Sequence, residues 1–387
     1  ACGGTMVTRR IYCDYAASTP ISSDAAIAMR MFLESHGPGN ASSLHLDGRV
    51  LRERLDGARD RVATMIGCAF KELLFTSGGT ESDNLAILGA VLSRRDSGRN
   101  GIVIGATEHH AVMDAAHFAQ TFLGAEVRIA RVDSAARIDL NHLESLLDDR
   151  TAVVSIQHAN NELGTIQPVQ DVAKLAHHMG AWFHCDAVQT PVTVPFAVSD
   201  LDADLVTVSS HKVYGPAGVG GLYARVPFQP THVGGTQERG LRAGSENVLG
   251  IVGFGVAAGL EVNRRQAGRT EIEAVSRSVR NLRHELVKYP AVTINTPPED
   301  ALSTMLHISV EGMTTEDLLL LLDRKGISAS GGSACASGAV EPSHVVKACG
   351  WSTDRQNGAL RLSFGIGTTD DDVRYVAETI GLLASRG

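Results

Sequence analysis

The stretch DLVTVSSHKVYGPAGVGGLY, residues 204–223, carries the pattern on which the fold prediction depends. It opens and closes with short apolar runs of the kind that form buried strands. The polar sequence Ser-Ser-His-Lys and a turn rich in Gly and Pro lie between these runs. The stretch therefore predicts two strands, with polar side chains delivered at the end of the first strand.

Similar runs recur toward the N-terminus and alternate with helical patterns. The runs are ELLFT (72–76), GIVIGAT (101–107), EVRIARV (126–132), TAVVSIQ (151–157) and AWFHCD (181–186). Between His45 and Gly67, apolar residues recur every three or four positions, which predicts an amphipathic helix that ends near Gly67. Strands that alternate with helices predict an α/β fold, with a mostly parallel sheet and helices on both faces. In such sheets ligands bind beyond the carboxyl ends of the strands.

The pattern changes after about residue 255. A long polar helix is predicted through residues 265–286, and strands are predicted at TMLHISVEG (304–312), GISAS (326–330) and ALRLSFGI (359–366). We therefore expect a large domain over residues 20–258, and a smaller α+β domain made of residues 1–19 and 259–387.

Composition indicates a soluble globular protein with small-molecule chemistry. The 387 residues are 43% hydrophobic and 20% charged. The net charge of −8, from 35 basic and 43 acidic residues, makes direct binding of nucleic acid an unlikely function. The chain has neither an apolar run of about 18 residues nor a signal-peptide pattern, so we expect a cytoplasmic protein with no membrane association.

The six cysteines, at positions 2, 13, 68, 185, 335 and 349, form no CxxC pair and no metal-ligand spacing. Neither a disulfide framework nor a metal site is predicted, and most of these thiols are expected to be small core residues. Cys335 differs because it lies in SGGSACASG (330–338), where its neighbours are too small to bury it.

A phosphate-binding site is one interpretation of the segment LLFTSGGTESDNLAI (73–87). A strand, a Gly-containing turn and a helix start follow one another there, so backbone N–H groups and the Thr80 hydroxyl are available to an anion. An ordinary capped helix explains the same residues.

Two further strand ends carry chemistry suited to a pyridoxal cofactor. Asp186 could hold a protonated ring nitrogen, and Lys212 could form a Schiff base in a partly desolvated site. Taken singly, an aspartate of this kind is often a cap and a lysine of this kind is often an ion-pair partner. Together with a phosphate site, they favour the cofactor.

Other polar residues have both a functional and a structural interpretation. His109 could stack on a flat cofactor and move protons, or be structural. Asn160 and Asn161 could bond a ring hydroxyl or a carboxylate, or simply form a turn. Arg361, on an apolar strand, could bind a substrate carboxylate or form an internal salt bridge.

Taken together, the motifs resemble those of the cysteine desulfurases, which are pyridoxal-phosphate enzymes of fold type I in the class V aminotransferase group. The resemblance covers nearly the whole chain, in order. It rests on YCDYAASTP, GNASSLH, FTSGGTESDNLAI, TEHHAV, HANNELG, CDAVQ, SSHKVYGPAGVGGLY, GGTQERGLRAGSEN, SGGSACASGAVEPSHV and RLSFG.

The resemblance implies a role for each site residue. Lys212 would hold pyridoxal 5'-phosphate covalently, Asp186 would bind its ring nitrogen, and His109 would stack on the ring. Residues expected near the ring hydroxyl and the phosphate are Asn161, Gln189, Gly79, Thr80, Ser209 and His211. Arg361 and Asn161 would bind the substrate carboxylate. Ser245 stands where the family commonly has threonine, whose hydroxyl reaches the neighbouring subunit's cofactor, so a homodimer is implied.

Cys335 is similar to the family's persulfide-forming cysteine, and the segment of about residues 328–340 resembles the longer, mobile type of cysteine loop. Gly331 and Ala336 replace a serine and a threonine of that pattern. The resemblance implies conversion of L-cysteine to L-alanine, with the sulfur delivered to an acceptor or scaffold protein. Iron-sulfur cluster assembly and thio-modification of tRNA or DNA remain open as destinations.

Three alternatives to this function stay open at the sequence level. A selenocysteine lyase and an aminotransferase have the same fold, although an aminotransferase needs no thiol at position 335. A non-catalytic docking module is the third, and the presence of Lys212 and Arg361 weighs against it.

Overall fold

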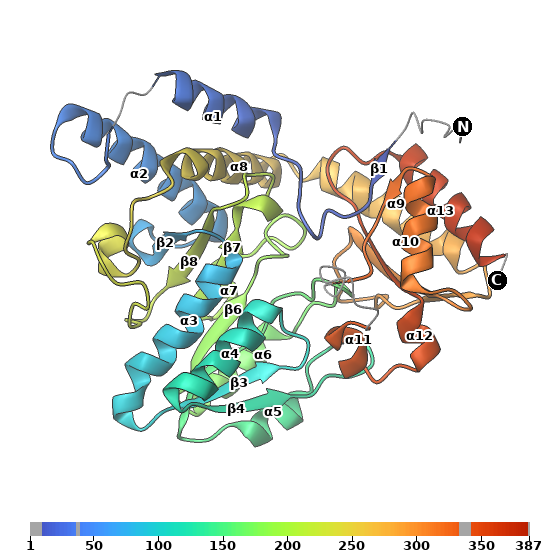
Figure 1. The fold of residues 1–387 in the computed structure, drawn as a ribbon, viewed down its shortest axis with the longest axis horizontal. Helices are drawn as coiled ribbons and strands as arrows, with labels where there is room; N and C mark the ends of the chain where they lie inside the picture. Colours follow the sequence, from blue (N-terminus) through green and yellow to red (C-terminus); the bar gives the residue numbers. More distant parts are fainter. Residues whose placement is uncertain (1–9, 36–38, 333–341, 386–387) are drawn as a thin grey trace, which may run out of the picture.

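The structure is a computed structural model that describes residues 10–35, 39–332 and 342–385 (Figure 1). Its largest element is a seven-stranded sheet in the order β2-β8-β7-β6-β5-β3-β4. The strands are β2 (Leu73–Thr76), β3 (Gly101–Gly105), β4 (Glu126–Ala130), β5 (Thr151–Ser155), β6 (Trp182–Asp186), β7 (Leu205–Ser209) and β8 (Gly220–Ala224). All pairings are parallel except those of β8, which runs antiparallel to β2 and β7. The predicted α/β fold with a mostly parallel sheet is confirmed.

Helices cover both faces of this sheet. One core forms under α3 (Gly79–Arg94) and α4 (His110–Leu123). The opposite core lies under α2 (Leu46–Ile66), α6 (Val169–His178) and α8 (Val248–Gln266). The remaining helices of this part are α1 (Ser23–Ser35), α5 (Leu140–Leu146), α7 (Val198–Leu201), η1 (Phe70–Glu72), η2 (Arg95–Ser97), η3 (Ser210–Lys212) and η4 (Gln237–Gly240). Burial on both faces explains why the strands read as continuous apolar runs.

The predicted amphipathic helix before Gly67 is confirmed as α2. His45 is its N-cap and accepts a hydrogen bond from the Gly48 N–H. Gly67 ends the helix with a φ of 68°, a left-handed conformation that glycine adopts without a steric penalty. Leu55 and Val62, predicted on the apolar face, are fully buried against the sheet.

A second, antiparallel sheet has the order β12-β10-β9. Its strands are β9 (Val292–Ile294), β10 (Met305–Val310) and β12 (Ala359–Ser363), and a separate core joins them to the neighbouring helices. Those helices are α9 (Thr270–Leu286), α10 (Thr315–Arg324) and α13 (Asp370–Ala384), whereas α11 (His344–Ala348) and α12 (Thr353–Asn357) contribute no residue to this core. A short strand, β1 (Ile11–Tyr12), pairs in parallel with β11 (Ile327–Ser328), so the N-terminal segment packs into this C-terminal part of the molecule (Figure 1).

The prediction of a single polar helix over residues 265–286 is wrong. Helix α8 continues to Gln266, and α9 begins at Thr270 after Gly268 and Arg269 adopt left-handed conformations with φ of 84° and 58°. Two consecutive left-handed residues end one helix and redirect the chain into the next. Continuous helical periodicity concealed this break.

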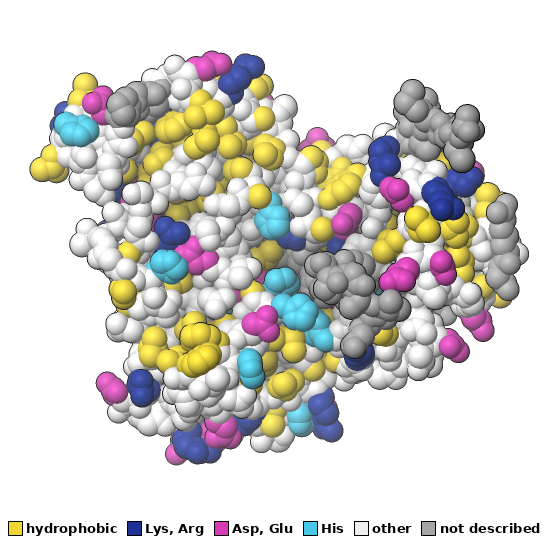
Figure 2. Space-filling view, in the orientation of Figure 1, with side chains coloured by type: hydrophobic (Ala, Val, Ile, Leu, Met, Phe, Trp, Pro, Cys, Tyr) yellow, Lys and Arg dark blue, Asp and Glu magenta, His cyan; other side chains and the backbone are white. Residues whose placement is uncertain are grey.

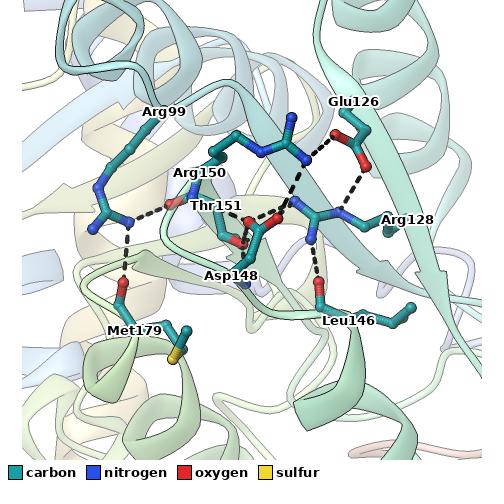
Figure 3. A network of polar contacts seen from close by, with 8 residues as sticks. All are labelled: Arg99, Glu126, Arg128, Leu146, Asp148, Arg150, Thr151 and Met179. Carbon is teal, nitrogen blue, oxygen red and sulfur yellow. Dashed lines mark hydrogen bonds and ion pairs between the residues drawn. The ribbon is translucent and has the colours of Figure 1, made fainter.

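At the starting ends of β3, β4 and β5, charged side chains pair with one another (Figure 3). Arg128 lies 3.1 Å from Asp148, and Arg150 lies 3.1 Å from Glu126. This network therefore fixes the outer strands at the end of the sheet opposite the carboxyl ends of the strands. No helix within the described ranges is long and apolar enough to cross a membrane.

Candidate active site

Lys212 follows β7 and lies where the two sheets approach each other. Its Nζ donates hydrogen bonds to the carbonyl oxygens of Ala16 and Ala17, the second at 2.9 Å. Desolvation, reinforced by Arg361, lowers the pKa of Lys212 to about 7, although Asp14 and Asp186 oppose the shift. The amine is therefore substantially unprotonated near neutral pH, as a Schiff-base lysine requires.

Asp186 ends β6 and is buried. Its Oδ1 accepts a hydrogen bond from the Val188 N–H at 2.9 Å. Desolvation raises its pKa, while the Val188 hydrogen bond, His109 and Lys212 act in the opposite direction. No lysine or arginine of the described residues forms an ion pair with Asp186, so this buried carboxylate is suited to bind a protonated ring nitrogen.

The first turn of α3, which follows a glycine turn, has backbone N–H groups without intrahelical partners that are available to an anion. Gly78 is the N-cap, and its φ of 155° belongs to a region open essentially to glycine. A Cβ on Gly79 would lie 3.0 Å from Val188 and 3.9 Å from the Cβ of Ser209. The Ser209 hydroxyl is buried and has no hydrogen-bond partner in the described part of the chain. An anion at this helix N-terminus would satisfy both the N–H groups and the hydroxyl.

Two other predicted phosphate-site residues lie beside these groups along the chain. Thr80, in the first turn of α3, is exposed. His211, in η3, is half-buried, and burial together with Lys212 lowers its pKa to about 4. His211 is therefore neutral at physiological pH and interacts with an anion by hydrogen bonding rather than by charge.

His109 is the N-cap of α4 and follows β3. Its Nδ1 accepts a hydrogen bond from the Ala111 N–H at 3.1 Å, so Nε2 carries the proton of the neutral ring. Although the side chain is exposed, desolvation by surrounding protein lowers its pKa, and Lys212 adds to that effect while Asp186 opposes it. Histidine side chains gather near the centre of the face shown in Figure 2.

The two adjacent asparagines after β5 make different hydrogen bonds. The Asn160 side chain is fully buried, and its oxygen accepts hydrogen bonds from the N–H groups of Glu162 and Leu163 at 2.9 and 2.8 Å. Asn160 is therefore a turn residue. Asn161 presents its carbonyl oxygen to Arg361 Nη1 at 2.8 Å, which brings it beside the arginine predicted to bind a carboxylate.

Arg361 crosses from the second sheet toward this group. Its Nη2 lies 2.7 Å from Asp14, so the internal salt bridge exists. Its Nε is buried and has no hydrogen-bond partner among the described residues. The Nε–H is therefore among the donors that remain for a ligand, and the structural and functional interpretations are compatible.

Gln189 donates a hydrogen bond to the carbonyl oxygen of Ala16 at 3.0 Å, and Lys212 donates to the same oxygen. Both residues line a cavity whose other wall includes Ser363 and Phe364. The predicted residues from separate strand ends are therefore brought together at the junction of the two sheets.

Two predicted residues lie apart from this group. Cys335 is outside the described residues. Before Cys335, the backbone of Ser330 is hydrogen-bonded to the backbone of Arg361. After Cys335, the Ser343 hydroxyl donates a hydrogen bond to the Glu162 carboxylate at 2.7 Å. Ser245 is exposed on the segment between η4 and α8. No contact ties Ser245 to Lys212 or Asp186 in the part of the chain that the structure describes.

Several polar residues around the site were not singled out from sequence. Asp14 pairs with Arg361, and Asp83, Glu108 and His184 are buried near Asp186. His184 could have been found, because residues two apart on a strand share a face. Asp14 gives no comparable local signal, since it lies 347 residues from its partner.

The site fits pyridoxal 5'-phosphate. The unpartnered Ser209 hydroxyl and the α3 N-terminus match a phosphate, the depressed pKa of Lys212 matches Schiff-base chemistry, and buried Asp186 matches a ring nitrogen. Within the described ranges, no group of three or more His, Cys, Asp or Glu side chains is arranged to hold a metal ion.

Comparison with known proteins assigns the class. The sequence profile described as Aminotransferase class-V matches residues 11–376. A solved structure titled "NIFS-LIKE PROTEIN" superposes with a TM-score of 0.90 at 32% identity, over 98% of this chain and 100% of that one. The chain therefore belongs to the class-V aminotransferase family.

Relatives within this family narrow the assignment. The chain is 39% identical to cysteine desulfurase IscS of Dictyoglomus turgidum, over 96% of this chain and 94% of the relative. It is 40% identical to a cysteine desulfurase of Cereibacter sphaeroides, with coverages of 96% and 95%. A structure titled "SspA in complex with cysteine" superposes with a TM-score of 0.79 at 28% identity, over 93% of this chain and all of that one. Within its family the chain is a member of the cysteine desulfurases, which are pyridoxal-phosphate-dependent enzymes.

Proposed function

We propose that the chain converts L-cysteine to L-alanine, forms a persulfide on Cys335 and passes that sulfur to an acceptor protein. The single observation that carries this proposal is Lys212. It is a lysine with a pKa lowered to about 7, surrounded by Asp186, Arg361 and a neutral histidine contributed by different segments of the chain. The relatives named above support cysteine as the substrate.

The cofactor would be held by Lys212, Asp186, Gln189 and the phosphate-site residues Gly79, Thr80, Ser209 and His211. When bound, pyridoxal phosphate supplies an electron sink for charge that develops at the substrate Cα. Ser245 of a second copy is proposed to reach the cofactor, which requires a homodimer.

The remaining steps belong to the protein. The free Nε–H of Arg361, with Asn161, would bind the substrate carboxylate and fix its orientation. Lys212 as a neutral amine would take the Cα proton. His109 carries its proton on Nε2 and would exchange that proton with the substrate sulfur.

Sulfur transfer needs a thiolate on Cys335. That thiolate would attack the substrate sulfur, so a sulfur–sulfur bond forms as the carbon–sulfur bond breaks, and the bonding electron pair stays with the carbon fragment. Protonation of that fragment gives alanine, while Cys335 keeps the transferred sulfur as a persulfide. Iron-sulfur cluster assembly and thio-modification of tRNA or DNA are both compatible destinations.

We also propose the division into a large domain (20–258) and a small domain (1–19 with 259–387), which the separate cores of the two sheets support. An apolar surface on α1 and around the start of α2 supports the homodimer (Figure 2). Its exposed members are Ile27, Met31, Leu33, Leu44 and Leu46. The described cysteines are all free thiols, which favours a reducing compartment such as the cytoplasm.

An absorbance spectrum recorded before and after addition of L-cysteine tests the function. We expect a band in the visible or near-ultraviolet region from the lysine-bound cofactor, a spectral change on cysteine addition, and release of alanine. Keto acid in place of alanine would identify an aminotransferase, and faster turnover of selenocysteine a lyase for that substrate. Absence of any band after reconstitution would indicate a non-catalytic docking module.

A further inference from the structure

A buried polar cluster lies beneath Asp186 and has no part in the roles described above. His184 precedes Asp186 by two residues on β6, so both side chains lie on the same face of the sheet. The His184 Nδ1 lies 2.8 Å from Ser155 Oγ, and its Nε2 lies 3.0 Å from Thr207 Oγ1. Both ring nitrogens are therefore held by hydroxyl groups of neighbouring strands.

Asp83 enters this cluster from α3. Its Oδ1 is 3.6 Å from His184 Nε2, which is too far for a hydrogen bond, and that nitrogen is already bonded to Thr207. The Asp83 side chain is buried, and Oδ1 has no hydrogen-bond partner in the described part of the chain. At Oδ1, an ionised carboxylate in this position would be desolvated without a compensating hydrogen bond.

The charged and titratable groups that face Asp83 come from two other segments. They are His184 and Asp186 on β6, and Glu108 after β3. No lysine or arginine of the described chain forms an ion pair with Asp83, Glu108 or Asp186. Three buried carboxyl groups without a fixed cation cannot all be ionised.

The electrostatic directions agree with this geometry. Desolvation, followed by Asp186 and Glu108, raises the pKa of Asp83 well above its ordinary value, and a hydrogen bond from Thr207 only partly opposes the shift. Burial lowers the pKa of His184 to about 3, so the imidazole is neutral. Desolvation and Asp186 likewise raise the pKa of Glu108.

We propose that Asp83 is a positioning residue that stays protonated at neutral pH beside a neutral His184, so that Asp83 adds no negative charge next to Asp186. An ionised Asp83 would raise the pKa of Asp186 further and favour its protonated form. Asp186 could then no longer hold a protonated ring nitrogen. The role of the Asp186 charge in holding a ring nitrogen rests on the proposed function, whereas the protonation of Asp83 does not.

The test compares thermal unfolding of the cofactor-free wild type, Asp83→Asn and Asp148→Asn between pH 5 and pH 8. Asparagine reproduces the shape of a protonated aspartic acid but does not titrate. If Asp83 is protonated only in the folded state, the unfolded chain binds fewer protons, and wild-type stability falls as pH rises above the ordinary aspartate pKa. The unfolding midpoint of Asp83→Asn should therefore rise relative to wild type by about 5 °C over this range.

Asp148→Asn is the matched control, because the same substitution falls at the opposite end of the same sheet. Asp148 is hydrogen-bonded by Arg128 and Thr151, and so it is stabilised as a carboxylate. Asp148→Asn should have a lower unfolding midpoint than wild type, and this difference should not change sign as pH rises. The proposal is overturned if Asp83→Asn behaves in this way, or if its midpoint keeps a constant offset from wild type.

If Asp83→Asn does not fold, the proposal can be tested by infrared spectra of protein whose aspartate residues carry an isotope label. Wild type and Asp186→Asn, both labelled at the aspartate side-chain carbonyl, should retain a protonated carboxyl band at pH 8. Absence of that band from both proteins would overturn the proposal. Neither the unfolding measurement nor the infrared measurement involves cofactor or substrate. A negative result in either would therefore not bear on the desulfurase proposal, and a negative cysteine assay would not bear on the protonation of Asp83.

Discussion

The two ends of the parallel sheet contain carboxylates in opposite settings. Where β3, β4 and β5 begin, each carboxylate meets a guanidinium group, as with Asp148 and Arg128 at 3.1 Å (Figure 3). Desolvation opposes ionisation of Asp148, but hydrogen bonds from Arg128 and Thr151 prevail and lower its pKa. At the carboxyl end, Asp83 and Asp186 have no guanidinium partner among the described residues, and their pKa values are raised.

This difference separates charge that stabilises the fold from charge that is available for chemistry. Paired groups at the starting end satisfy each other and add modest stability at a partly exposed surface. Groups at the carboxyl end are desolvated with no fixed partner, so their protonation responds to whatever binds nearby. A substitution at the carboxyl end should therefore mainly reduce catalysis, whereas a substitution at the starting end should mainly reduce stability.

The largest effect is expected from Lys212→Ala. Removing this lysine should abolish the covalent cofactor band and reduce alanine formation by at least about 10³-fold, because both Schiff-base and proton-transfer roles are lost. Lys174→Ala, which removes an exposed lysine paired with Asp171 at 2.9 Å, should leave both unchanged. Retention of the band by Lys212→Ala would show that another amine holds the cofactor.

Arg361→Lys should have the next largest effect. Lysine keeps the positive charge beside Asp14 but loses the planar fork whose Nε–H remains available to a substrate carboxylate. We expect kcat/KM to fall by about 10- to 100-fold, mainly through KM, as measured by initial rates of alanine formation. Arg374→Lys, at an exposed pair on α13, is the control. An unchanged KM in Arg361→Lys would argue for a purely structural arginine.

The pH dependence of cofactor capture provides a smaller but sharper test. Burial lowers the pKa of Lys212 to about 7, so the nucleophilic neutral amine increases with pH only up to that value. The rate at which cofactor-free protein captures pyridoxal phosphate should therefore rise about tenfold per pH unit below 7 and then level. A rate that continues to rise to pH 9, as for N-acetyl-lysine in solution, would contradict the lowered pKa.

Asp148→Asn should have the smallest effect. Because the folded-state pKa of Asp148 lies below the unfolded value, its ion pairs add stability above the unfolded pKa, and that stability is lost as pH falls through the folded value. We expect a loss of about 0.5–1 kcal/mol at pH 7 in urea unfolding, discounted for partial exposure, and a smaller loss near pH 4. A reduction in cysteine turnover by this variant would break the distinction between the two ends of the sheet.

Much of the fold could be predicted because local sequence reports burial. Apolar runs bounded by turns identified all seven strands of the large sheet, and the spacing of Leu55 and Val62 identified α2. Local sequence does not report where a continuous helical pattern changes direction. Gly268 and Arg269 therefore break the predicted 265–286 helix, and the three-residue strand β9 gave too little signal to be found.

The site was predictable where chemistry coincides with a strand end, as for Asp186 and Lys212. It was less predictable where a residue acts through contacts distant in sequence. The pairing of Arg361 with Asp14 joins opposite ends of the chain, and the approach of Asp83 to His184 depends on how α3 packs on the sheet. Neither leaves a short-range pattern. The roles predicted for all of these site residues, including Cys335 and Ser245, remain predictions.

The most direct test of the central claim is a single turnover of the reconstituted protein with L-cysteine. Alanine and the mass of the peptide that contains Cys335 should be measured in the same sample. The account predicts one alanine for each added sulfur atom, with that sulfur on the Cys335 peptide and neither product in Lys212→Ala. Alanine formed without added sulfur on that peptide, or sulfur located on another cysteine, would contradict the account.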